Sequence, residues 1–170
     1  MSENEERDWQ QELKEKDPKL LKNCYACVGE GWETLMDNML GRIQHYMKWR
    51  WENEYQENRV VIESGEVPPE DKESIQQPEF SQIKQKFGGL RAYYCGGDQY
   101  IRGVVDMAEG MSYKICEKCG DKGYATDFGW VKIMCEKHHE EEHLAAKRTA
   151  SEYQKKIDDR NLKEHEQNEE

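Results

Sequence analysis

The stretch Cys116-Glu-Lys-Cys119, fifteen further residues and Cys135-Glu-Lys-His138 decides how the C-terminal half of this chain folds. Each pair of potential metal ligands has a two-residue gap, and the segment between the pairs is long enough for one small hairpin. This spacing is typical of a tetrahedral zinc site made by three thiolates and one imidazole. We therefore expect one structural Zn2+ held by Cys116, Cys119, Cys135 and His138.

All four ligands in this arrangement come from the protein, so the expected site is closed. Catalytic zinc keeps a position open for water, whereas structural zinc is held by four protein groups. A ribbon of this size buries little apolar surface, and metal binding would therefore supply much of its folding free energy. His139 is the alternative fourth ligand if the register slips by one residue.

The remainder of the chain is polar and acidic. Of its 170 residues, 35% are hydrophobic and 36% are charged, against roughly 45–50% apolar and a quarter charged in average domains. The net charge is −11, but the acidic excess lies in the N-terminal segment, in residues 61–79 and in the C-terminal tail. The centre of the chain is close to neutral, which weakens any inference from the overall charge.

The sequence contains no apolar stretch typical of a secretory signal, and none long enough to span a membrane. We therefore expect a cytoplasmic protein that does not associate with membranes. In that reducing compartment, six cysteines in paired spacings favour metal binding over disulfides.

A long amphipathic helix is predicted for residues 32–57. Gly29-Glu-Gly-Trp32 precedes it and predicts a turn, and a weaker helix in residues 3–16 ends at Pro18. The long helix is indicated by apolar residues at three- and four-residue intervals: Trp32, Leu35, Met36, Met39, Leu40, Ile43 and Met47.

A β-hairpin is predicted for residues 80–95. Gly88-Gly89 separates two β-type runs and suits a tight turn in which both central residues have positive φ. Alternation along the two strands predicts one apolar face, made by Ile83, Phe87, Leu90 and Tyr94.

A short helix over residues 98–112 follows, with Asp98 as its N-cap. Its apolar side contains Ile101, Val104, Val105, Ala108 and Met111. The ribbon then pairs residues 124–126 with 130–134, and the charged tail favours a fraying helix.

These elements predict an α+β fold with a long helix, a hairpin, a short helix and a zinc ribbon. We place the zinc-ribbon domain at residues 24–139, with 63–79 as a solvated loop. Residues 1–23 form an acidic N-terminal segment with a weak helix, and 140–170 form a charged helix or tail.

Cys24 and Cys27 form a second, isolated pair with a two-residue gap. The pair is half of a metal site, which Cys95 and His45 would complete, or it is a redox pair. Thioredoxin-like chemistry requires a βαβ context that is not visible here. We favour two small buried thiols, because free cysteine often serves as a buried apolar residue.

Two further sets of residues are candidates for a binding surface. Lys84, Lys86, Arg91 and Tyr93 form a basic and aromatic cluster that is suited to nucleic acid, although such charges are usually a solvated hairpin face. Trp49 and Trp51 cannot both face the core of one helix, and an exposed tryptophan can mark a partner surface. The simpler interpretation, which we favour, is that each covers a neighbouring apolar edge.

Several stretches together resemble a family of small, uncharacterised proteins encoded by bacteriophages and prophages. The resemblance covers residues 24–139, through GEGW at 29–32, SQIKQKFGGLRAYYCGGD at 81–98, MAEGMSYKICEKCG at 107–120 and the C-x2-H ending of the ribbon. It implies a phage-encoded protein that works in the bacterial host cytoplasm, and it carries over no catalytic residues.

The leading functional hypothesis is a zinc-binding accessory protein that binds a host or phage protein and modulates a host or phage process, host defence included. The sequence contains no nucleophile elbow, P-loop or HExxH motif, so no enzyme class is indicated. The first alternative is a nucleic-acid-binding ribbon, which would also use Lys114, Lys118, Lys122 and Lys132. The second is a metalloenzyme with an open site around Cys24 and Cys27.

Overall fold

The computed structural model describes residues 8–64 and 75–168, and the side chains of these residues apart from 54–64 and 162–168. The first half contains α1 (Trp9–Lys16), α2 (Pro18–Leu21), β1 (Tyr25–Cys27), a 3-10 turn η1 (Glu30–Trp32) and α3 (Glu33–Ser64). The second half contains β2 (Glu79–Lys86), β3 (Gly89–Cys95), α4 (Gln99–Ser112), β4 (Tyr124–Ala125), β5 (Ile133–Met134) and α5 (Glu136–Asn168). The fold is α+β, as predicted.

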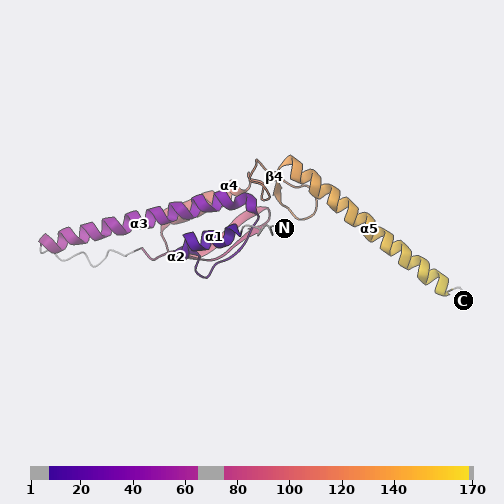
Figure 1. Ribbon diagram of the computed structural model, residues 1–170, viewed down its shortest axis with the longest axis horizontal. Coiled ribbons are helices and arrows are strands. Elements are labelled where there is room, and N and C mark those ends of the chain that lie inside the picture. The colour runs from indigo at the N-terminus through magenta and orange to yellow at the C-terminus, as the bar shows by residue number, and fades with distance from the viewer. Residues whose placement is uncertain (1–7, 65–74, 169–170) are drawn as a thin grey trace, which may run out of the picture.

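The body of the molecule is a three-stranded sheet packed against helices. The strand order is β1-β2-β3, with β1 parallel to β2 and β2 antiparallel to β3. Both α3 and α5 extend beyond this body, in different directions (Figure 1). No helix in the described residues is both long enough and apolar enough to cross a membrane.

One hydrophobic core joins the sheet, α3 and α4. Its fully buried members include Trp32, Leu40, Ile43, Ile83, Leu90 and Ile101. Residues of α1 and α2 also belong to this core, because Trp9, Leu13, Leu20 and Leu21 are buried in it. Residues 9–21 are therefore part of the body of the fold and not an appendage.

The long helix differs from its prediction at both ends. It begins one residue later than expected, after η1, and continues to Ser64. Residues 65–74 lie outside the described part of the chain, so most of the predicted 63–79 loop is not described. At its far end, Glu79 already belongs to β2.

The hairpin turn lies one residue earlier than predicted. Its central residues are Phe87 and Gly88, with φ of 53° and 82°, and Gly89 already pairs with Lys86. Packing selects this register, because a Cβ on Gly89 would lie 2.4 Å from Cζ of Tyr113. The prediction that Phe87 belongs to the apolar face of the hairpin is wrong, because Phe87 lies at the turn and its side chain is 70% exposed.

α4 covers the free edge of β3 with two polar side chains. Ser112 Oγ accepts a hydrogen bond from the Leu90 N–H at 2.8 Å, and Glu109 Oε1 accepts one from the Ala92 N–H at 2.9 Å. An uncovered edge strand is a template for unwanted pairing. Asp98 caps the start of α4 as predicted, by accepting hydrogen bonds from the N–H groups of Tyr100 and Ile101.

The apolar side of α4 is wider than the surface that covers it. Ile101, Val104, Val105 and Ala108 are buried as predicted. Met111, which was predicted on the same apolar side, is 48% exposed. The neighbouring Met107 is also exposed.

Candidate metal centre

Four short structural features bring the predicted ligands together. The chain leaves α4, makes an isolated bridge between Ile115 and Lys122, and places Cys116 and Cys119 on the turn between them. We call this turn, residues 115–122, the knuckle. β4 and β5 then form the small hairpin, and Cys135 directly follows β5. His138 lies in the first turn of α5. Both strands are two residues long, which is shorter than the predicted 124–126 and 130–134.

The ligand atoms of Cys116, Cys119, Cys135 and His138 all lie within 4.8 Å of one another, and this is the only such metal-binding group in the described residues. The two sulfurs of Cys119 and Cys135 are 3.7 Å apart. His138 Nδ1 lies 3.4 Å from the Cys116 sulfur and 3.3 Å from the Cys135 sulfur.

These separations match the edges of a tetrahedron around a small divalent ion. Bonds of about 2.3 Å to sulfur and about 2.0–2.1 Å to nitrogen place two sulfurs about 3.8 Å apart, and a sulfur and a nitrogen about 3.6 Å apart. The four side chains therefore form a possible metal site with every position filled by the protein.

The thiols of this cluster differ in how readily they ionise. Burial disfavours the Cys116 thiolate, but hydrogen bonds from the backbone of Cys135, from His138 and from the knuckle backbone lower its pKa to about 6. The Asp121 backbone favours ionisation of Cys119, but burial and the side chains of Cys116, Cys135 and Asp121 raise its pKa to about 12. A bound cation would supply the positive charge that three adjacent thiolates need.

His138 presents Nδ1 to the sulfurs, and its Nε2 faces Glu141 Oε2 at 4.0 Å. The alternative ligand His139 points elsewhere, with Nε2 3.2 Å from Asp127 Oδ1. The ring of Phe128 packs against both His139 and His143. The geometry therefore supports His138, and not His139, as the fourth ligand.

The knuckle docks onto the Gly29–Trp32 segment, a contact that the sequence did not indicate. Gly31 N–H donates to Glu117 O at 2.8 Å, and Gly29 N–H donates to Glu117 Oε1 at 3.1 Å. The buried Trp32 donates from Nε1 to Ile115 O at 3.0 Å. These bonds join the metal cluster to the start of α3, about 90 residues away in sequence.

Close backbone approach explains the glycines of this segment. A Cβ on Gly31 would lie 2.1 Å from Cys116 O, and one on Gly29 would lie 2.3 Å from Glu117 O. Neither separation is possible without moving the knuckle. Gly29 and Gly31 therefore leave room for the knuckle backbone, in addition to forming a turn before the helix.

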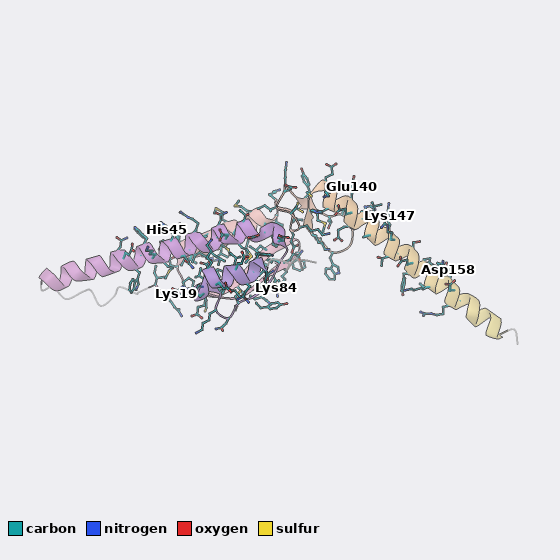
Figure 2. All side chains as sticks on the ribbon, viewed as in Figure 1. Lys19, His45, Lys84, Glu140, Lys147 and Asp158 are labelled. Carbon is teal, nitrogen blue, oxygen red and sulfur yellow. The ribbon has the colours of Figure 1, made fainter. Side chains whose placement is uncertain are left out.

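A second contact fixes the start of α5 on the knuckle. Glu142 pairs with Lys118 at 2.9 Å and with Lys132 at 3.4 Å. The hydrogen bond from Lys118 is the main reason that the pKa of Glu142 is lowered. Beyond this point α5 leaves the body, and Glu140, Lys147 and Asp158 mark its course (Figure 2).

The second cysteine pair is divided between two environments. Cys24 is buried, and burial raises the pKa of its thiol, whereas Cys27 and Cys95 are exposed. The expectation of a buried thiol therefore applies to Cys24 and not to Cys27. The three cysteines and His45 do not form a metal-binding group in the described part of the chain.

The predicted basic cluster does not form one continuous surface. Lys84 lies over the Tyr93 ring, with Nζ 5.4 Å from its centroid, and Lys86 lies over the exposed Phe87 ring. Arg91 instead turns toward α4, where it pairs with Glu109 at 3.2 Å and donates to Tyr113 Oη at 2.7 Å. Arg91 therefore has a structural role in this arrangement.

Trp49 and Trp51 are both exposed on α3. Trp49 stacks with Tyr46, which in turn stacks with Tyr100 of α4. This stacking agrees with the expectation that Trp49 covers an apolar edge. Trp51 is 74% exposed and lines a shallow pocket with residues of α2.

No family model matches the sequence, and the comparisons with curated proteins and with solved structures found no similar protein.

Proposed function

We propose that this protein is a phage-encoded zinc-binding accessory protein that binds another protein in the bacterial host cytoplasm and modulates a host or phage process, such as host defence. The observation that carries the proposal is the closed Cys3His cluster, docked by backbone hydrogen bonds onto the start of the longest core helix. Three thiolates with one imidazole favour zinc among the common cellular divalent ions. A metal held by four protein ligands stabilises the fold and is not a reaction centre.

The large exposed elements support a binding role. α5 extends from the knuckle, and α3 extends beyond the sheet on the other side of the body (Figure 1). Exposed apolar residues occur on both the hairpin and the ribbon, including Phe87 and Trp130. Exposed aromatic rings are enriched on surfaces that protein partners use.

A protein partner is favoured over nucleic acid by the charges of the candidate basic surface. Arg91, Lys118 and Lys132 are paired with the carboxylates of Glu109 and Glu142. Each of these pairs would have to break before the cation contacted a phosphate.

Affinity capture from the bacterium that carries the gene tests the proposal. The bait is the zinc-loaded chain, the lysate is treated with nuclease, and the matched control bait is Cys135→Ser. We expect a protein retained by the wild-type bait and lost from the control, because the knuckle surface needs the metal. A folded, zinc-loaded bait that retains no protein above background contradicts the proposal.

The nucleic-acid alternative rests on the cation–ring pairs of the hairpin, Lys84 with Tyr93 and Lys86 with Phe87. Binding through phosphates would weaken steeply as salt is raised. Absence of binding to single-stranded DNA and RNA at low salt removes this alternative.

A further inference from the structure

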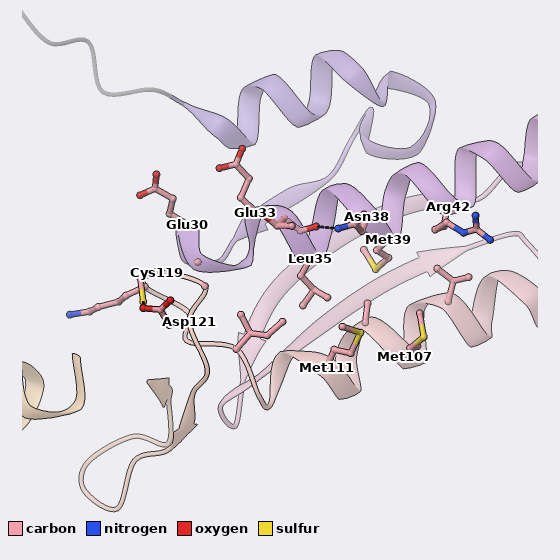
Figure 3. Close-up of a pocket in the computed structure, with 17 residues that line it drawn as sticks. Glu30, Glu33, Leu35, Asn38, Met39, Arg42, Met107, Met111, Cys119 and Asp121 are labelled. Carbon is pink, nitrogen blue, oxygen red and sulfur yellow. Dashed lines mark hydrogen bonds between the residues drawn. The ribbon is translucent and has the colours of Figure 1, made fainter. Parts of the chain in front are cut away.

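A groove lies between α3 and α4, and the knuckle closes it at one end. The groove is open to solvent along one side and has a volume of about 850 Å³. Figure 3 shows Leu35 and Met39 on the α3 side, Met107 and Met111 on the α4 side, and Cys119 beside Asp121 at the closed end. Neither the geometry of the metal site nor the packing of the hydrophobic core explains why this space is open.

Apolar residues of α3 and α4 line much of the groove, together with polar residues such as Thr34 and Asn38 of α3. Leu35, Met39, Val104 and Ala108 are buried beneath it. Met107 is 60% exposed and lies one turn before Met111 on the same side of α4. Methionine is unbranched and polarisable, so a wall of methionines adapts to apolar side chains inserted between two helices.

The two ends of the groove carry opposite charges. At the knuckle end, Glu30 and Asp121 are exposed, and the nearby Lys118 is already paired with Glu142. At the other end, Arg42 is exposed and donates a hydrogen bond from Nη2 to Tyr100 Oη at 3.2 Å. An occupant that complements both ends is cationic at the knuckle and anionic beside Arg42.

We propose, on the basis of the protein-binding function above, that this groove is the partner site and that its occupant is an amphipathic helix of the partner protein. The helix presents leucine- or methionine-like residues at one-turn spacing to Met107 and Met111. It places basic residues against Glu30 and Asp121. The α3 residues that line the groove run from Glu33 to Arg42, which is about three helical turns, so about three turns of partner helix fill it.

The zinc-loaded full chain with 13C-methyl-labelled methionine provides the direct test. The probe is a synthetic twelve-residue helical peptide with leucines at i, i+4 and i+7, two lysines at one end and two glutamates at the other. We expect its addition to shift the methyl signals of Met107 and Met111 and to leave Met134 unchanged. A peptide in which glutamates replace the lysines should bind at least about tenfold more weakly.

Two matched variants separate the groove from the remainder of the surface. Met107→Glu with Met111→Glu should abolish peptide binding, and both positions are exposed, so the fold should remain intact. Tyr25→Glu with Tyr124→Glu places the same two charges on exposed aromatic residues outside the groove and should bind like wild type. Unmoved Met107 and Met111 signals at about 1 mM peptide overturn the inference. Equal peptide binding by the double variant also overturns it.

The same variants distinguish this inference from the broader proposal. If wild-type and double-variant baits capture the same protein from lysate, the groove inference fails and the protein-binding function stands. If neither wild-type nor variant captures a protein, the broader proposal fails. If Met107 and Met111 shift with protein concentration alone, the occupant is a second copy of this chain and the inference of a foreign helix is wrong.

Discussion

Gly31 lies at the contact between the Cys3His site and the rest of the fold. Its N–H donates to Glu117 O, and its missing side chain lets Cys116 O approach. We expect Gly31→Ala to destabilise the protein by about 3 kcal/mol, because the new methyl group separates the knuckle from α3. Thermal unfolding of the metal-loaded protein measures this loss.

Gly41 provides the matched control for that substitution. It lies within α3, and a Cβ there would meet nothing within 4 Å. Gly41→Ala should raise stability by about 0.5–1 kcal/mol, because alanine loses less backbone entropy in a helix. Equal melting temperatures for wild type and Gly31→Ala would contradict the docking account.

Asp98 links the N-terminus of α4 to α3. Burial opposes its ionisation, but hydrogen bonds from Tyr46 Oη and from the N–H groups of Ile101 and Tyr100 outweigh burial and lower the pKa of the carboxyl. The Tyr46 Oη distance to Asp98 Oδ2 is 2.5 Å. A lowered pKa in the folded state means that the ionised group stabilises the fold at neutral pH.

We therefore expect Asp98→Asn to cost about 1 kcal/mol at pH 7, since asparagine keeps the cap and loses the charge. The stabilising effect of the ionised group is complete above its unfolded-state pKa, and it disappears as the pH falls through the lowered folded-state pKa. The difference between wild type and variant, followed by denaturant unfolding from pH 7 to pH 3, should shrink accordingly. A constant difference over this range would show that the charge is not involved.

At the scale of elements, α4 protects β3 through the Glu109 carboxylate. The carboxylate accepts from the Ala92 N–H and pairs with Arg91, so its removal leaves both groups without this partner. We expect Glu109→Ala to cost about 2 kcal/mol in unfolding free energy and to speed hydrogen exchange at the Ala92 amide.

Asp106→Ala on the same helix is the control. Its pair with Arg102 is solvent-exposed, so its loss should change stability by less than about 0.5 kcal/mol. The Ala92 amide should exchange at the wild-type rate in this variant. Equal effects of the two substitutions would indicate a general loss of helix stability and contradict the edge-capping role of Glu109.

The elements also show where sequence patterns are sufficient. The metal ligands could be predicted because their identity and spacing are local to 23 residues, and the geometry brought the same four together. The hairpin was predicted, but its turn was misplaced by one residue. Gly88 and Gly89 both tolerate positive φ, so the sequence allows a turn centred on either of two residue pairs. The Tyr113 ring selects between them, because it leaves no room for a side chain at the strand position that Gly89 occupies.

Long-range contacts account for what the patterns missed. In the sequence, Gly29 and Gly31 indicate an ordinary turn. Their contacts with the knuckle are visible only in the folded structure. Periodicity placed Met111 on the same apolar side as the buried residues of α4, but it cannot show that α3 and the sheet cover only part of that side. The uncovered part became the groove, which no single segment of sequence reveals.

At the scale of the whole molecule, the metal cluster joins three parts that are distant in sequence. The knuckle contacts the Gly29–Trp32 segment, the ribbon contacts the hairpin through the Gln85 Nε2 bond to Val131 O, and Glu142 of α5 pairs with Lys118 of the knuckle. Loss of the metal should therefore disturb the groove end and the direction of α5 together. The sheet and the α3–α4 core should persist.

Zinc content per chain tests this account most directly. The full chain, purified without added metal, should contain one zinc per chain by elemental mass spectrometry, and so should Cys95→Ser, which replaces an exposed thiol outside the cluster. Cys135→Ser should contain little or none and should unfold in the ribbon at lower temperature. Wild-type protein that is folded without zinc, or full zinc retention by Cys135→Ser, would contradict the account.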